Sequence, residues 1–240
     1  MCGRYASSKS AADLALEFEV EEIGVAAGLP ASYNVAPTDE VYIVAQRPAA
    51  EERPAQRQLR VARWGLVPSW AKDRSIGSRM INARLETVAE KPAFRKAFAS
   101  RRCLVPADGY FEWYQAQNGR KQPFFIHPRD GRSLAMAGLY EFWRDRAAGP
   151  EAPLLWSCSI ITTSATDDLG RIHDRMPLVV EPDAWEEWLG AGPADPGAMV
   201  PAADAASGLE AWPVSAAVGN VRNNSPELVE PVAPSSEEGS

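Results

Sequence analysis

The second residue of the chain, Cys2, can carry an uncommon kind of chemistry. Once Met1 is removed, Cys2 has a free α-amine and a thiol on neighbouring carbon atoms. The amine, with an ordinary pKa of about 7.7–8.0, can attack an aldehyde to give a Schiff base. The thiol can then close a five-membered thiazolidine ring in an intramolecular step. The alternative is that a small residue follows the initiator methionine by chance, and Cys2 alone does not decide between the two interpretations.

A carboxylate lies among aromatic residues in the segment GYFEWY, residues 109–114. Alternation along a strand places Glu112 on the face opposite Phe111 and Trp113. If Glu112 is buried, its pKa should rise, which suits proton transfer. If that face meets solvent, Glu112 is an ordinary surface residue.

A histidine lies between two arginines in the segment GRIHDRMP, residues 170–177, which follows an apolar run and leads into another. A loop histidine of this kind is a candidate general acid or base, so His173 joins the set of reactive residues. The alternative is a surface turn without a chemical role.

Two further segments suit nucleic-acid binding. In INARLE, residues 81–86, Asn82 can hydrogen-bond a sugar or the backbone, and Arg84 can contact a phosphate. In RWGLVPSW, residues 63–70, tryptophans among basic residues suit base stacking. The alternatives are a helix start with a surface arginine for the first segment and plain core packing for Trp64 in the second.

The composition of the 240 residues, 45% apolar and 24% charged, is typical of a soluble globular protein. No apolar run approaches the roughly 18 residues of a transmembrane helix, and the start of the chain does not resemble a signal peptide. We therefore expect a cytoplasmic protein. Three dispersed cysteines and two histidines form neither a disulfide framework nor a ligand set, so we expect no metal and no cofactor.

The charge is unevenly distributed. The net charge is −7, but residues 60–102 hold eleven Lys and Arg against three Asp and Glu, a local balance of +8. A basic segment inside an acidic chain can form a phosphate-binding surface. It can equally be a solvated basic face.

Apart from short helices, the pattern favours β-structure. Helices are predicted at Ala11–Val20, with Ser10 as N-cap, at Pro92–Ala99 and at Asp183–Leu189. Strands are predicted at Val41–Ala45, Leu59–Leu66, Cys103–Val105, Gly109–Tyr114, Gln122–His127, Leu134–Trp143, Leu155–Thr163 and Leu209–Val214. Asn118-Gly119 and Asp130-Gly131 are hairpin signals.

These elements predict one α+β domain around a mostly antiparallel, barrel-like sheet with a few short peripheral helices. We expect this domain to span residues 1–231. Residues 232–240 form a small-polar, acidic tail that we expect to be disordered.

Several longer segments occur in a fixed order along the chain: MCGRY, YNVAPT, RWGLVPSWAKD, INARLETVAEKPAFR, RRCLVPADGYFEWY, TTSA, IHDRMPLVV and VGNVRNNSPELVEP. This ordered set resembles the SOS response-associated peptidase (SRAP) family of abasic-site processing proteins. The resemblance runs from Cys2 to about Pro231.

The resemblance implies a protein that binds single-stranded DNA and cross-links its N-terminal cysteine to the ring-opened aldehyde of an abasic site as a thiazolidine. By motif, Cys2 is the nucleophile, Asn82 orients the opened sugar, Glu112 assists Schiff-base formation, and His173 donates or accepts protons. The implied DNA-contacting residues are Arg4, Asn34, Trp70 and Arg84. The implied partner is single-stranded DNA with abasic sites, bound by a monomer that associates with the nucleoid when on DNA, without a membrane or a metal.

Two features depart from the family pattern. Phe111 stands where a tyrosine is expected before the Glu-Trp pair, and the net charge of −7 does not favour strong non-specific DNA binding. Two other functions stay open. One is a cysteine peptidase with an N-terminal nucleophile, and the other is a non-catalytic single-stranded DNA-binding module. Lyase activity through the Schiff base is a further expectation.

Overall fold

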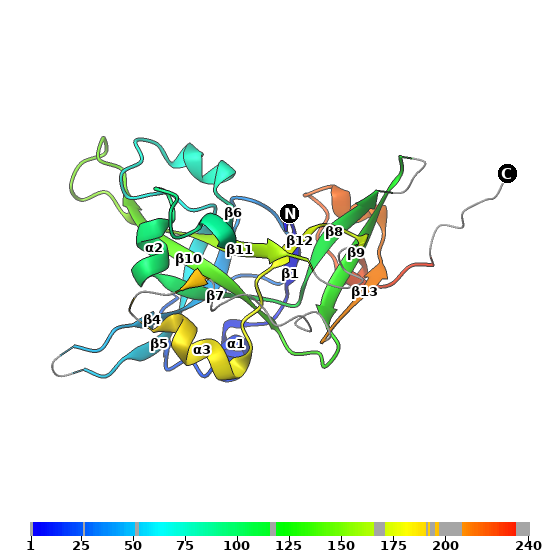
Figure 1. Ribbon diagram of the computed structural model, residues 1–240, viewed down its shortest axis with the longest axis horizontal. Helices are drawn as coiled ribbons and strands as arrows, with labels where there is room; N and C mark the ends of the chain where they lie inside the picture. Colours follow the sequence, from blue (N-terminus) through cyan, green and yellow to red (C-terminus); the bar gives the residue numbers. More distant parts are fainter. Residues whose placement is uncertain are drawn as a thin grey trace.

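The structure, a computed structural model, describes residues 2–25, 27–50, 53–115, 119–165, 171–190, 192, 195–196 and 208–233. Two sheets make up its body, a larger one on the left of Figure 1 and a smaller one on the right. The start of the chain lies between them, and the short helices gather around the larger sheet.

Five strands of the larger sheet close into a barrel. Neighbours in the order β11-β10-β7-β4-β5 are antiparallel, and a parallel pairing of β5 with β11, at Arg63–Ser157 and Trp64–Cys158, joins the two ends. The barrel strands are β4 (Glu40–Arg47), β5 (Gln56–Trp64), β7 (Arg102–Ala107), β10 (Leu134–Arg144) and β11 (Leu154–Ser164).

Three short strands extend the barrel. β2 (Glu22–Ile23) runs parallel to β5, and β6 (Asn82–Arg84) runs parallel to β11. β12 (Arg175–Pro177) pairs with β11 in the antiparallel sense. The β6 and β12 pairings therefore bring Asn82 and the segment that holds His173 to the same barrel strand.

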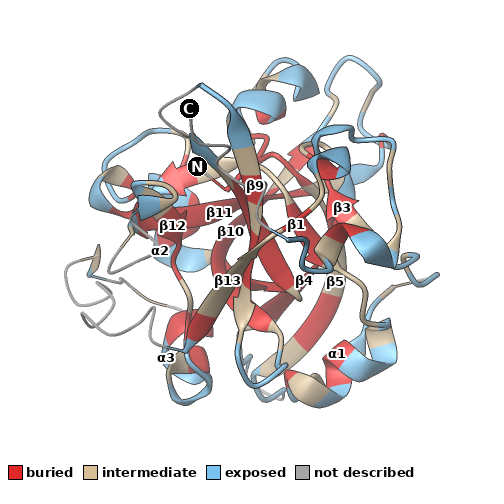
Figure 2. Ribbon diagram, turned by 90° about the vertical axis from the view of Figure 1, so that its right-hand side faces the viewer, coloured by how far each residue is buried: buried red, intermediate tan, exposed pale blue. Residues whose placement is uncertain are grey.

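Alternate residues of the barrel strands enter two different cores. Met136 and Tyr140 of β10 belong to a cluster inside the barrel, whereas Ala137 and Leu139 belong to a cluster shared with the helices and therefore outside it. Figure 2 shows the buried strands at the centre and the exposed outer faces of the helices around them.

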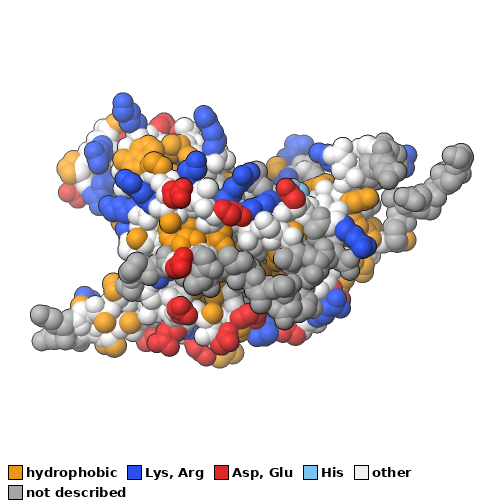
Figure 3. Space-filling view, viewed as in Figure 1, with side chains coloured by type: hydrophobic (Ala, Val, Ile, Leu, Met, Phe, Trp, Pro, Cys, Tyr) orange, Lys and Arg blue, Asp and Glu red, His pale blue; other side chains and the backbone are white. Residues whose placement is uncertain are grey.

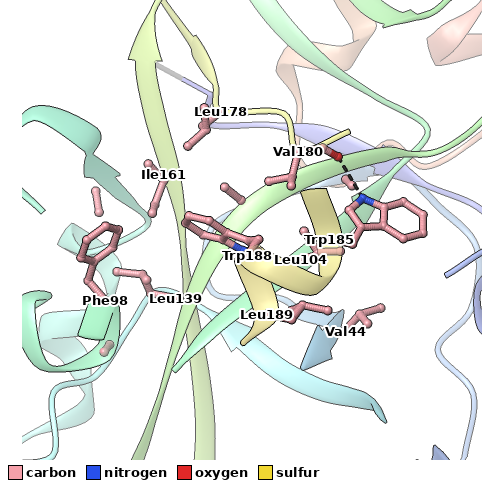
Figure 4. Packing of buried hydrophobic residues seen from close by; sticks show 14 of the residues in the cluster. Val44, Phe98, Leu104, Leu139, Ile161, Leu178, Val180, Trp185, Trp188 and Leu189 are labelled. Carbon is pink, nitrogen blue, oxygen red and sulfur yellow. Dashed lines mark hydrogen bonds between the residues drawn. The ribbon is translucent and has the colours of Figure 1, made fainter. Parts of the chain in front are cut away.

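The helices that cover the barrel are α1 (Ala11–Glu17), α2 (Arg95–Ser100) and α3 (Trp185–Leu189). Ser10 starts α1 with a capping box, since its hydroxyl accepts from the amide of Asp13 at 3.2 Å. In Figure 4, Trp185 and Trp188 of α3 lie against the outer face of the barrel, and the indole of Trp185 donates to the carbonyl of Val180 at 2.9 Å. Short 3-10 helices are η1 (Arg74–Arg79), η2 (Leu85–Thr87), η4 (Pro182–Ala184), η6 (Ala216–Gly219) and η7 (Pro226–Val229).

The smaller sheet is antiparallel throughout and has the order β13-β9-β8-β1-β3. Its strands are β1 (Tyr5–Ser7), β3 (Ser32–Val35), β8 (Gly109–Gln115), β9 (Lys121–Pro128) and β13 (Leu209–Pro213). The N-terminal strand β1 is thus an interior strand of this sheet, with a partner on each side.

The predicted fold class, α+β with a mostly antiparallel barrel, is confirmed. The predicted hairpin at Asp130-Gly131 is wrong: Gly131 does make a turn with φ 74°, but β9 before it and β10 after it belong to different sheets. β8 and β9 do pair as predicted, although Asn118 of the expected turn lies outside the described residues, as do residues 234–240 of the predicted tail.

In the part of the chain that the structure describes, every helix is too short or too polar to cross a bilayer.

One basic residue of the segment 60–102 serves the fold instead of the surface. Arg102, 5% exposed, donates to the carbonyls of Trp188 at 2.6 Å, of Phe98 at 2.9 Å and of Gly192 at 2.9 Å, and also to that of Gly190. Its guanidinium lies over the Trp188 ring at 5.7 Å. Arg102 therefore satisfies the orphan carbonyls at the ends of α2 and α3 and holds both helices on the barrel.

We predict that Arg102→Ala lowers the free energy of unfolding by about 3 kcal/mol, because several buried carbonyls lose their donor at once. Urea denaturation measures the change. Arg95→Ala on the exposed face of α2 is the matched control and should stay within about 0.5 kcal/mol of the wild type. Equal stabilities of the two variants would contradict the structural role of Arg102.

Candidate active site

Cys2 lies three residues before the start of β1 and is fully buried, with 0% of its surface exposed. The register Tyr5–Tyr110 continues toward the chain start, since the amide of Phe111 donates to the carbonyl of Arg4 at 2.9 Å. This antiparallel register places Gly3 opposite Glu112, and the neighbouring Cys2 is near enough for the Glu112 charge to act on its thiol. Burial, with a contribution from the Glu112 carboxylate, raises the pKa of the Cys2 thiol, so that the thiol is protonated at neutral pH.

Glu112 is 3% exposed. The expectation that Glu112 is buried is therefore correct, and the alternative that it is an ordinary surface residue is wrong. Phe111 points to the opposite side, into a third buried cluster against which Trp113 packs. Burial raises the pKa of Glu112, and the nearby His173 opposes part of this rise. Glu112 is therefore an acid that holds its proton at a higher pH than an exposed glutamate does.

Asn82 reaches the same place from the other sheet. Its Nδ2 donates to the backbone carbonyl of Cys2 at 2.7 Å. Its Oδ1 is buried and has no hydrogen-bond partner among the described residues. Asn82 thus fixes the backbone of Cys2 and keeps one acceptor available for another group.

His173 lies before β12, with 31% of its side chain exposed. Its Nδ1 is 2.9 Å from the amide nitrogen of Arg175 and 2.9 Å from Oδ1 of Asp174. An unprotonated Nδ1 can accept from that amide, and a protonated Nδ1 can donate to the carboxylate. His173 therefore has a partner in either protonation state, as a proton carrier needs.

Arg175 holds this segment in position. Its guanidinium makes a two-point ion pair with Glu86, at 2.6 and 3.1 Å, and donates to the carbonyl of Thr162 at 2.6 Å. The sequence pattern gave no role to Arg175 or to the buried Tyr110, which lies in one hydrophobic cluster with Cys2. The alternation that places Glu112 on one face of β8 also places Tyr110 on that face and could have revealed it.

Arg4 and Asn34 make internal contacts. Arg4 donates to Oδ1 of Asn34 at 2.6 Å and to the carbonyls of Val218 and Gly219 at 2.9 and 3.1 Å. The Asn34 amide, in a residue 4% exposed, donates to the carbonyls of Val218, Asn220 and Asn223 at 2.9–3.2 Å. These two predicted DNA-contacting residues thus attach the segment 218–223 to β1 and β3.

Trp70 and Arg84, in contrast, are exposed. Trp70, in the loop before η1, is 58% exposed, whereas Trp64 is wholly buried as a core residue. Arg84 ends β6, two residues after Asn82 and on the same face. Among the described residues, no hydrogen bond or ring contact joins Trp70 to Cys2.

The exposed cations of the basic segment are Lys72, Arg74, Arg79, Arg84, Lys91, Arg95 and Lys96. Figure 3 shows Lys and Arg gathered over the lobe at the upper left, around an apolar patch, and Asp and Glu along the lower edge. The uneven distribution of charge along the sequence is therefore also seen on this face, with basic residues on one part and acidic residues on another.

Among the described residues, no group of three or more His, Cys, Asp or Glu side chains is placed to hold a metal ion.

The fold is shared with solved structures. A protein from Bacteroides thetaiotaomicron is 26% identical with a TM-score of 0.74, and the match covers 97% of this chain and 100% of that chain. A protein from Bordetella bronchiseptica is 26% identical with a TM-score of 0.72, over 89% of this chain and 100% of that one.

Curated relatives match over most of this chain, and two of them match over nearly their own whole length. The abasic site processing protein YoqW of Bacillus subtilis (strain 168) is 38% identical, over 96% of this chain and 99% of that protein. The abasic site processing protein YedK of Escherichia coli (strain K12) is 35% identical, over 97% and 100%. The abasic site processing protein HMCES of Gallus gallus is 33% identical, over 84% and 66%.

The fold and the buried cluster around Cys2 define a two-sheet α+β protein with an enclosed polar site between the sheets. The family model described as SOS response associated peptidase (SRAP) matches residues 1–221. The chain belongs to the SRAP family.

The buried carboxyl of the site gives a prediction of its own. An acid whose pKa is raised by folding contributes stability below its unfolded pKa of about 4.3, and this contribution is lost as the pH rises through the folded pKa. The glutamine in Glu112→Gln does not titrate, so the variant does not lose this stability as the pH rises. Its free energy of unfolding relative to the wild type should therefore increase with pH above about 4.

Urea denaturation of the Glu112→Gln variant and the wild type between about pH 4 and pH 8 measures this difference. Glu181→Gln, which replaces an exposed carboxyl, is the control and should show no such rise. A Glu112→Gln variant that loses stability relative to the wild type as the pH rises would show that the sign of the pKa shift is wrong.

Proposed function

We propose that this chain captures abasic sites in single-stranded DNA, by cross-linking the Cys2 of the Met1-free protein to the ring-opened sugar aldehyde. The observation that carries the proposal is the convergence of Glu112 and Asn82 on Cys2, with the Asn82 amide 2.7 Å from the Cys2 carbonyl. The names of the relatives as abasic site processing proteins support the choice of lesion.

The first step forms an imine. The α-amine of Cys2 adds to the aldehyde carbon, and the resulting hydroxyl leaves as water after it gains a proton. Glu112 suits the delivery of that proton, because burial keeps it protonated at higher pH than an exposed carboxyl. Met1 must be absent, since an amide nitrogen is not a nucleophile.

The second step closes the ring. The Cys2 sulfur bonds to the imine carbon, the π pair of the C=N bond moves to nitrogen, and the thiol proton ends on that nitrogen. The product carbon is saturated and no longer withdraws electrons. The ring therefore removes the imine through which β-elimination would break the DNA strand, so cross-linking shields the lesion, while lyase activity is confined to the imine stage.

Two residues complete the proposed site. The unpartnered Oδ1 of Asn82 is an acceptor for a hydroxyl of the opened sugar. His173, partly exposed and with a partner in either protonation state, moves a proton during opening of the sugar ring. Arg84 and Trp70, both exposed, suit contacts with a phosphate and a base of the strand.

The family description names a peptidase, which is the alternative function. A peptidase with Cys2 as nucleophile needs the thiolate, and burial raises the pKa of the Cys2 thiol. The cross-linking reaction begins with the amine instead, so it is favoured. If the chain were a non-catalytic DNA-binding module, the costly burial of the Glu112 carboxyl would have no chemical explanation.

The test is intact mass spectrometry of the Met1-free protein after incubation with a single-stranded oligonucleotide that carries one abasic site. We expect one adduct per chain, with the mass of protein plus oligonucleotide less one water. Cys2→Ala should reduce the denaturation-resistant adduct by at least about 100-fold, because its imine cannot close and hydrolyses.

Cys103→Ala, which removes another fully buried thiol, should leave the adduct intact and is the matched control. An oligonucleotide without the lesion should give none. The absence of adduct with Met1-free wild type, or an undiminished adduct with Cys2→Ala, would contradict the proposal.

A further inference from the structure

Two tyrosine hydroxyls beside Cys2 are buried without a hydrogen-bond partner among the described residues. Tyr5 and Tyr110 are both 0% exposed, and the hydroxyl oxygens of both lack a partner. A buried hydroxyl without a partner lowers stability, and phenylalanine would fill the same space without that cost. Such a group suggests a role that arises only during a reaction.

The fold places Tyr110 in the proposed site. Tyr110 and Glu112 are two residues apart on β8 and therefore share one face, which is turned away from Phe111. Tyr110 and Cys2 belong to the same buried cluster, and Tyr110 pairs across the strands with Tyr5, three residues after Cys2. The phenol of Tyr110 thus stands on the face of β8 that meets the start of the chain.

Ring closure needs a group of this kind. Burial and the Glu112 carboxylate both raise the pKa of the Cys2 thiol, so its conversion to a thiolate is unfavourable. Among the described residues, the Cys2 sulfur has only a long contact as donor, 3.9 Å to the carbonyl of Arg4, and receives no hydrogen bond. A hydrogen bond donated to the sulfur would stabilise the thiolate.

We propose that Tyr110 is a further catalytic residue of the cross-linking reaction, whose phenol donates a hydrogen bond to the Cys2 sulfur as the thiazolidine closes. The inference rests on the proposed function. The thiol proton passes to the Glu112 carboxylate and from there to the imine nitrogen, while sulfur bonds to carbon and the C=N π pair moves to nitrogen. Tyr110 keeps its own proton throughout.

The electrostatic environment agrees with a donor. Burial, together with the nearby Cys2 and Glu112, raises the pKa of Tyr110, so the phenol stays protonated. Burial also raises the pKa of Tyr5, but Cys158 is its strongest charged neighbour and Cys2 comes after it. Tyr5 therefore offers a matched control, an equally buried hydroxyl that is coupled mainly to a different thiol.

The experiment compares Tyr110→Phe with Tyr5→Phe and the wild type, all Met1-free, on the abasic oligonucleotide. Samples are quenched over time with and without borohydride and separated under denaturing conditions. Borohydride preserves imine plus ring, whereas only the ring survives without it. The two series separate imine formation from ring closure in each protein.

For Tyr110→Phe we expect imine formation near the wild-type rate and ring closure slower on the order of tenfold. The pH profile of ring closure should move to higher pH, because the thiol loses the donor that favours its charged form. The melting temperature should equal or exceed that of the wild type. Tyr5→Phe should close the ring at the wild-type rate.

Wild-type ring closure by Tyr110→Phe, or equal slowing in Tyr5→Phe, would overturn the inference and leave the proposed function standing. A lower melting temperature for Tyr110→Phe with imine formation and closure slowed together would assign the hydroxyl a structural role instead. If the Met1-free wild type forms no adduct at all, the proposed function fails, and the inference fails with it.

Discussion

The pairing of β1 with a strand on each side is the constraint on which the rest of the structure depends. Chain termini usually fray, because few contacts hold them. Here β3 and β8 flank β1, and Cys2, three residues before this strand, is excluded from solvent. In the proposed reaction, the Cys2 amine of the Met1-free protein, held in this way, is aligned with Glu112 and Asn82 at little further entropic cost. Since β8 carries Glu112 and the β6–β11 pair carries Asn82, the site forms where the two sheets meet, and neither sheet could build it alone.

Burial is also the main cause of the pKa shifts in the site, and these shifts have opposing consequences for the proposed reaction. The same loss of solvent that keeps a proton on Glu112 also keeps one on the Cys2 thiol. In the proposed reaction, the first effect favours the loss of water that forms an imine, and the second disfavours the sulfur attack that follows. The proposed hydrogen bond from the Tyr110 phenol to sulfur would offset the second effect without weakening the first. Buried groups that lower the stability of the resting protein are typical of sites selected for reaction instead of rigidity.

The features of the fold and the site that could be predicted from the sequence are those that depend on residues close together along the chain. Alternation along residues 109–114 predicted the strand and separated Glu112 from Phe111, because strand periodicity is local. It did not determine whether that face meets solvent, since the answer depends on β1, about a hundred residues earlier. The Asp130-Gly131 signal described the turn correctly but not the sheets that it joins, because the partner of each flanking strand lies far along the chain. The parallel pairing of β5 with β11, which closes the barrel, has no local signature at all.

The contacts of Arg4 show how a motif residue can support a site through internal hydrogen bonds. Its guanidinium makes three internal hydrogen bonds of 2.6–3.1 Å, and each bond to a charged group contributes about 1.5–3 kcal/mol. A phosphate contact, which the motif resemblance implies for Arg4, would have to compete with these bonds, whereas the exposed Arg84 gives up no such set. Arg4 and Asn34 instead tie residues 218–223 to β1 and β3, so the late segment of the chain supports the strand that presents Cys2. The first and the late motifs of the chain thus depend on each other physically, because residues 218–223 hold Arg4 and Asn34 in position.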